Sequence, residues 1–91
     1  MSESQIEKAV CAFAKAHGVS TIKLSGANDR GKADRMFMRD GKVIFIEFKA
    51  AGKRPTALQE RFLRLRQEDG FAALWVDCAD HAIDSIKRHL L

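Results

Sequence analysis

The chain has 91 residues, of which 46% are hydrophobic and 31% are charged, and its formal net charge is +4. This length suits one modest hydrophobic core and excludes a second domain, so residues 1–91 are expected to form a single unit. The chain has no apolar run of about 20 residues and no signal-peptide pattern at its start, which predicts a soluble, cytoplasmic protein without a membrane partner. The positive charge favours a polyanion such as nucleic acid as a partner.

The first part of the chain predicts a helix followed by a strand. Apolar side chains recur every three or four residues between residues 2 and 18, and Ser4 and Glu7 have the spacing of a capping box at the start of that helix. Residues 19–24 then alternate apolar and polar side chains, as a half-buried strand does. A polar, glycine-bearing loop is expected at residues 25–33.

Residues 33–49 contain two strand-like runs joined by Asp40 and Gly41. An Asp-Gly pair between such runs is a strong signal for a two-residue hairpin of type I′, so the two strands are expected to be antiparallel neighbours. With a loop of this length, counting back along both strands places Asp34 opposite Glu47. The hairpin is therefore predicted to bring two carboxylates together.

The second half of the chain predicts a helix over residues 55–70 with a capping box of Thr56 and Gln59, a strand over 71–76 and a last helix over 80–91. The element order is α-β-β-β-α-β-α. A helix between the third and fourth strands permits a right-handed crossover to a parallel strand, which predicts a small α/β domain with a mixed sheet flanked by helices. The apolar stripe of the middle helix is expected at Leu58, Phe62 and Leu65.

The predicted pair of acids needs a physical reason. Residues directly opposite each other have Cβ atoms about 4.5–5.5 Å apart, and like charges at that distance repel. Their face also carries Met36 and Phe45, so burial would raise the pKa of at least one carboxylate unless a cation lies between them. Mg²⁺ and Mn²⁺ take carboxylate, water and phosphate oxygens, which suits the pair Asp34 and Glu47.

Lys49 lies on the same face as Glu47, about 6.6–6.8 Å further along the strand, where its ammonium can reach a phosphate or a water beside a metal ion. An alternative remains open. Glu47 and Lys49 can instead form a surface ion pair on an edge strand, with Asp34 as an ordinary loop acid.

Asp34, Glu47 and Lys49, spaced as D-x12-E-x-K on a hairpin, resemble the core of the PD-(D/E)xK nuclease superfamily, whose fold is a restriction-endonuclease-like mixed sheet. More narrowly, the chain resembles the VRR-NUC family of virus-type replication-repair nucleases, in its small stand-alone phage and bacterial form. The resemblance covers nearly the whole chain through Glu7 and the segments GKAD, FIEFKA and RPTALQ. Ala33 departs from the superfamily, which has proline there, but this position supplies backbone shape rather than a ligand.

The resemblance implies a Mg²⁺- or Mn²⁺-dependent endodeoxyribonuclease of the cytoplasm of a bacterial or phage-infected cell. Its expected substrate is branched DNA such as the four-way (Holliday) junction of DNA repair. Cutting two strands with matched geometry calls for two sites, so a homodimer is expected. The alternative from another class is a non-catalytic DNA-binding module with a nuclease-like fold.

By this resemblance Asp34 and Glu47 would be metal ligands, together with the backbone carbonyl of Phe48. Lys49 would stabilise the attacking hydroxide and the negative charge that develops on the phosphoryl group.

Two further residues keep two alternatives each. Glu7 would reach the metal through a water or directly, or would only cap its helix with Ser4. Gln59 would hold the lytic water or a phosphate, or would only cap the next helix with Thr56. A basic group around these positions is expected to bind DNA phosphates, with solvated surface charge as the alternative: Lys23, Arg30, Lys32, Lys53 and Arg54.

Overall fold

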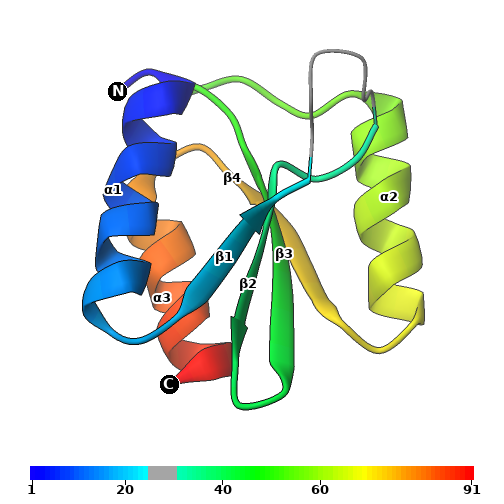
Figure 1. The fold of residues 1–91 in the computed structure, drawn as a ribbon. Coiled ribbons are helices and arrows are strands. Elements are labelled where there is room, and N and C mark those ends of the chain that lie inside the picture. The colour runs from blue at the N-terminus through cyan, green and yellow to red at the C-terminus, as the bar shows by residue number, and fades with distance from the viewer. Residues whose placement is uncertain (25–30) are drawn as a thin grey trace.

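The structure is a computed structural model, which describes residues 1–24 and 31–91. Its elements, in chain order, are α1 (Glu3–Ala16), β1 (Ser20–Lys23), β2 (Arg35–Arg39), β3 (Lys42–Phe48), α2 (Ala57–Glu68), β4 (Ala72–Val76) and α3 (Ala79–Leu90). This succession confirms the predicted α-β-β-β-α-β-α order. In Figure 1, α1 and α3 lie together on one side of the sheet and α2 lies on the other.

The four strands form one mixed sheet in the order β1-β2-β3-β4. The pairs β1–β2 and β2–β3 are antiparallel, and β3–β4 is parallel because α2 carries the chain back before β4 begins. The predicted mixed sheet is therefore confirmed. Within the described residues β4 pairs only with β3, so one edge of β4 faces outward between α2 and α3.

The β2–β3 hairpin has the predicted two-residue turn. Asp40 has φ 52° and Gly41 has φ 78°, and positive φ at both central positions is what a type I′ turn requires. The register also agrees with the prediction, with Arg39 opposite Lys42, Met38 opposite Val43 and Met36 opposite Phe45.

The alternation of side chains along β3 divides the apolar residues between two cores. Ile44, Ile46 and Phe48 are buried against α1 and α3, whereas Phe45 faces α2. The first core is the larger and takes most of the buried residues of α1 and α3. The α2 side is built from Ala33, Phe45, Leu63 and Ala73, with Leu24, Met36, Val43, Phe62 and Trp75 packed around them. Glu47 and Lys49 share the parity of Phe45, so they project on the thinner α2 side.

The predicted capping box of the first helix was wrong by two residues. Ser2 is the N-cap of α1, and its box partner is Gln5 rather than Glu7. The sequence contains the spacing of a capping box twice, at Ser2 and Gln5 and at Ser4 and Glu7. A helix that begins at the first of these gains backbone hydrogen bonds and keeps the same apolar contacts. The box of Thr56 and Gln59 at the start of α2 is present as predicted.

The predicted apolar stripe of α2 was right for Phe62, which packs against the core, and wrong for the two leucines. Leu63 is its buried residue, at 4% exposure, whereas Leu58 is 59% exposed and Leu65 is 36% exposed. The helix is rotated so that Leu63 meets the sheet beside Phe45 and Ala73, because it rests on a narrow strip of the sheet rather than on a broad face. Of the helices in the described ranges, none combines the length and the apolar character that crossing a bilayer requires.

Candidate active site

One strand and two helices that are far apart in sequence have ends that meet at one end of the molecule. The carboxyl end of β3 lies there, with the first turn of α1 on one side and the first turn of α2 on the other (Figure 1). Both helices begin with a complete capping box, so their positive dipole ends are fixed toward this region. The arrangement suits a negatively charged ligand and surrounds Glu47, the last but one residue of β3.

Glu47 is 1% exposed although it is a carboxylate. Its Oε2 atom accepts a hydrogen bond from Gln59 Nε2 at 2.8 Å and lies 3.3 Å from the ammonium of Lys49. Its Oε1 atom is buried and has no hydrogen-bond partner among the described residues. Burial, followed by the charge of Asp34, raises the pKa of Glu47 to about 7, and the charge of Lys49 opposes this shift. The site therefore holds one carboxylate oxygen whose desolvation is not compensated.

Asp34 lies one residue before β2, where the hairpin register continues toward Glu47. Its Oδ2 atom accepts a hydrogen bond of 2.8 Å from the backbone N–H of Phe48, and its own carbonyl accepts one of 2.8 Å from the N–H of Leu24. These contacts fix both the backbone and the carboxylate of Asp34 at the end of β3. The two acids of the predicted pair are thus neighbours.

The approach to Asp34 depends on a glycine. Gly31 has φ +86°, and a Cβ atom at that position would lie 3.0 Å from the Cβ of Leu58 on α2. A side chain at residue 31 would strain this left-handed backbone and would require Leu58 to move by a few tenths of an ångström. The exposed Leu58 thus lies against this segment, which leads directly into Asp34.

The donor set has the chemistry of a site for a hard divalent cation. The N–H and C=O of one strand residue point to the same side, so the Phe48 carbonyl faces the side where its N–H meets Asp34. Two carboxylates and a backbone carbonyl are oxygen ligands of the kind that Mg²⁺ and Mn²⁺ take. Among the described residues no three His, Cys, Asp or Glu side chains gather around one possible ion. A cation held here would therefore also need water or substrate oxygens.

Gln59 caps α2 with Thr56, which was one of its two predicted roles, and it also makes a contact with Glu47 that was not predicted. Its Oε1 accepts from the N–H of Thr56 at 2.9 Å as part of the capping box, and its Nε2 donates to Glu47. One side-chain amide thus ties the first turn of α2 to the buried carboxylate.

The structure places Glu7 away from this pair of acids. Its Oε2 atom pairs with Arg35 Nε and, at 3.3 Å, with Lys23 Nζ, on the face of the sheet that α1 covers. The acid of α1 whose charge contributes to the raised pKa of Glu47 is Glu3. Glu3 precedes Glu7 by one helical turn on the same helix face, so the spacing of the two acids in the sequence already relates them.

Three of the predicted DNA-binding residues are exposed near the two acids. Lys53 and Arg54 lie on the segment that joins β3 to α2, a few residues after Lys49, and Lys32 lies two residues before Asp34. Lys23 lies instead on the α1 side of the sheet, where it forms an ion pair with Glu7. Arg30 lies outside the described residues.

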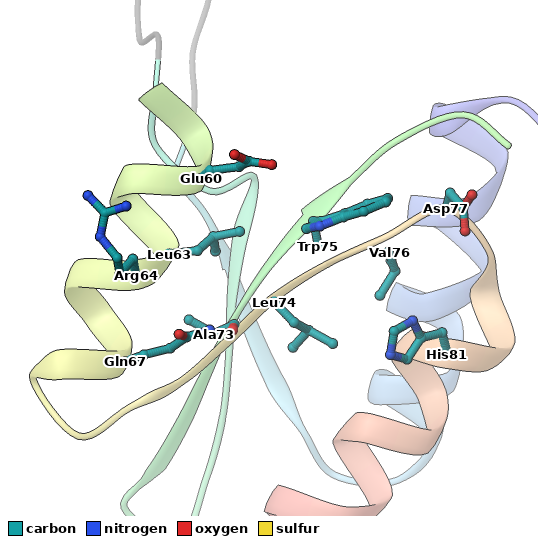
Figure 2. Close-up of a pocket in the computed structure, with 10 residues that line it drawn as sticks. All are labelled: Glu60, Leu63, Arg64, Gln67, Ala73, Leu74, Trp75, Val76, Asp77 and His81. Carbon is teal, nitrogen blue, oxygen red and sulfur yellow. Dashed lines mark hydrogen bonds between the residues drawn. The ribbon is translucent and has the colours of Figure 1, made fainter. Parts of the chain in front are cut away.

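A groove of about 450 Å³ runs along the outer edge of β4, and the sequence did not predict it. Figure 2 shows α2 on one side of it, α3 on the other and β4 as its floor. Trp75 lies in this groove in parallel register with Glu47, so the two side chains are neighbours on one face of the sheet. The lining is Glu60, Leu63, Arg64, Gln67, Ala73, Leu74, Trp75, Val76, Asp77 and His81.

Comparison with known proteins identifies the fold. No protein-family model matches the chain, and no curated protein is similar to it in sequence. A solved structure titled "VRR_NUC domain" superposes with a TM-score of 0.80 at 22% sequence identity, covering 98% of this chain and 97% of the other. The coverage is nearly complete in both directions, so no large element is added or missing. The chain therefore has the fold of a VRR_NUC domain, as its sequence predicted.

Proposed function

We propose that the protein is a member of the VRR-NUC family and a Mg²⁺- or Mn²⁺-dependent DNA endonuclease. The observation that carries the proposal is the state of Glu47, a fully buried carboxylate beside Asp34 with one oxygen that has no partner among the described residues. A divalent cation between Asp34 and Glu47 would supply that partner and remove the repulsion between the two acids.

The residues divide the chemistry of phosphodiester hydrolysis between them. Asp34, Glu47 and the carbonyl of Phe48 would hold the cation, which when bound lowers the pKa of a water molecule and polarises the phosphoryl oxygen. Lys49 is held at Glu47 with only 15% of its side chain exposed, so its ammonium would meet a phosphate in a partly desolvated site. Gln59 donates a hydrogen bond to the same carboxylate oxygen of Glu47 and helps to keep it in place.

The surroundings favour a nucleic acid as the substrate. The positive ends of α1 and α2 converge on the site, and both ends attract phosphate groups. Lys53 and Arg54 extend this positive region along the segment after Lys49, with Lys32 before Asp34. Backbone contacts of this kind recognise DNA shape rather than sequence.

Branched DNA, such as a four-way junction, is the substrate structure that we propose within this class, together with a homodimer as the active form. The resemblance to the small stand-alone members of the family supports both. A single domain of this size covers about one side of a duplex, and matched cuts in two strands require two sites related by symmetry.

The test uses the purified protein with a synthetic four-way junction, a duplex of the same sequence and a single strand, each in Mg²⁺, Mn²⁺ or EDTA. We expect cleavage with either metal and none in EDTA, with the junction cut fastest. Cleavage that persists in EDTA would refute the proposed chemistry. Tight binding without cleavage in every metal would instead favour a DNA-binding module without activity.

The acids of α1 give a paired prediction. Glu3→Gln should slow cleavage by about threefold to tenfold at low metal concentration, because removing a nearby negative charge weakens attraction of the cation. Glu7→Gln should leave the metal dependence unchanged and lower the melting temperature instead, because it leaves Arg35 and Lys23 without their shared partner. Metal titrations of the cleavage rate and thermal melts separate the two effects. A changed metal dependence in Glu7→Gln, with none in Glu3→Gln, would indicate that Glu7 and not Glu3 acts on the cation.

A further inference from the structure

The groove beside the site contains one aromatic ring in a position that phosphate binding does not explain. Trp75 of β4 is in parallel register with Glu47 of β3, and neighbouring strands lie about 4.8 Å apart. The ring is therefore one strand away from the carboxylate that would hold the cation. It is partly exposed in a groove whose floor is an open strand edge.

A planar group already lies over this ring. The guanidinium of Arg54 is 5.4 Å from the centroid of the Trp75 ring. Its other contact is a 3.8 Å ion pair with Glu60, and the two side chains are 73% and 48% exposed. An exposed ion pair of this length is weak, so Arg54 can exchange it for a DNA phosphate and uncover the ring. That face of Trp75 can thus accept another planar group.

The groove also offers polar groups at its floor. The carbonyl of Val76 accepts a hydrogen bond from the N–H of Lys49, directly after β3, so the alternating residues Ala73 and Trp75 direct their backbone groups outward. The outward carbonyl of Ala73 is already engaged by Gln67 Nε2 at 2.7 Å. Next to Trp75 the edge therefore combines an aromatic face with backbone donors and acceptors, which is the combination that binds a base outside its stack.

We propose that Trp75 is a stacking platform for one unpaired nucleobase of the strand whose phosphate lies at Asp34 and Glu47. The inference rests on the proposed function, and it names the feature of the substrate that the site would recognise. A base inside a duplex has both faces covered and cannot enter the groove, whereas an unpaired base can stack on the ring without being extruded first. Branched DNA with an unpaired base at the branch point would then be selected through access to Trp75.

Trp75 is the only tryptophan of the chain, so its fluorescence reports on the platform directly. The protein is titrated in EDTA, where no cleavage is expected, with a four-way junction, a duplex carrying one unpaired nucleotide and a fully paired duplex. Anisotropy of end-labelled DNA gives the bound fraction in parallel. At equal saturation, DNA with an unpaired base should quench the indole emission strongly and the fully paired duplex should not.

Two variants complete the test. Trp75→Leu should weaken binding of the duplex with the unpaired nucleotide roughly tenfold and leave the fully paired duplex within about twofold, whereas Trp75→Phe should keep most of the difference. Phe71→Leu is the matched control, because Phe71 is also a partly exposed aromatic residue next to β4 but packs on Phe45. It should leave both affinities unchanged.

Several outcomes would overturn the inference. Equal quenching by paired and unpaired DNA, or an equal loss of affinity for both in Trp75→Leu, would show that the ring does not select unpaired bases. A blue shift of the emission with rising protein concentration and no DNA would mean that a second copy covers the groove. Metal-dependent cleavage without quenching would reject the platform and leave the nuclease proposal intact. Quenching by unpaired DNA with no cleavage in Mg²⁺ or Mn²⁺ would reject the nuclease proposal and leave the stacking of a base on Trp75 intact.

Discussion

Lys49→Ala is expected to reduce the cleavage rate by about 10²- to 10³-fold, the cost of removing one preorganised charge from a phosphoryl-transfer site. The loss should lie in kcat, with DNA binding in EDTA changed by less than about threefold, because Lys49 is held at Glu47 inside the site rather than on the surrounding surface. Asp34→Asn should abolish metal-dependent cleavage to a similar extent, because it removes a charged ligand.

Lys42→Ala is the matched control for this experiment. Lys42 is an exposed lysine at the other end of the same strand, next to the hairpin turn. It should leave kcat unchanged, and thermal melts should show that all three variants are folded. Full activity in Lys49→Ala and Asp34→Asn would refute the proposed site.

The buried Glu47 predicts an unusual dependence of stability on pH. Its pKa rises from an ordinary value of about 4.5 to about 7 in the folded protein, mainly through burial. Between these values the unfolded chain releases the proton and the folded chain retains it, so the free energy of unfolding should fall as the pH rises from 4.5 to 7. Through this residue the free energy of unfolding should be lower above pH 7 than below pH 4.5 by on the order of 3 kcal/mol.

Glu47→Gln tests this prediction because it keeps the shape and removes the titration. In EDTA at pH 8 the variant should melt on the order of 10 °C above the parent, and the difference should vanish near pH 4.5. Mn²⁺ at pH 8 should raise the melting temperature of the parent and have little effect on the variant. Glu60→Gln, an exposed site on α2, serves as the control. A parent that gains stability relative to Glu47→Gln between pH 4.5 and 7 would contradict the assigned burial.

The hairpin was the most predictable part of the molecule. Asp40 and Gly41 determined the turn type, the turn determined the register, and the register led from Glu47 back to Asp34. These steps are local, because each depends on residues that are close in sequence. The capping box at Gln59 was predictable for the same reason.

What sequence patterns could not supply was the orientation of helices on the sheet. The stripe of α2 was misplaced because one exposed and one buried leucine have equal hydrophobicity, and only packing against Phe45 distinguishes Leu63 from Leu58. Glu7 was predicted for the site, and Glu3, which lies on the same helix face, was not. Which of the two acids acts on Glu47 depends on the angle of α1 to the sheet, and a local pattern does not contain that angle. Trp75 lies next to Glu47 because β4 pairs in parallel with β3, and all of α2 separates these two strands in the sequence.

The two contacts of Gln59 couple local order to chemical readiness. The same amide closes the first turn of α2 and donates a hydrogen bond to the buried carboxylate. Fraying of that turn would therefore also break the hydrogen bond between Gln59 and Glu47. In the proposed nuclease, a copy in which α2 has not yet formed its first turn, during folding or through local opening, would present an incompletely positioned carboxylate to a bound strand. Formation of the first turn of α2 would then be a condition for cleavage.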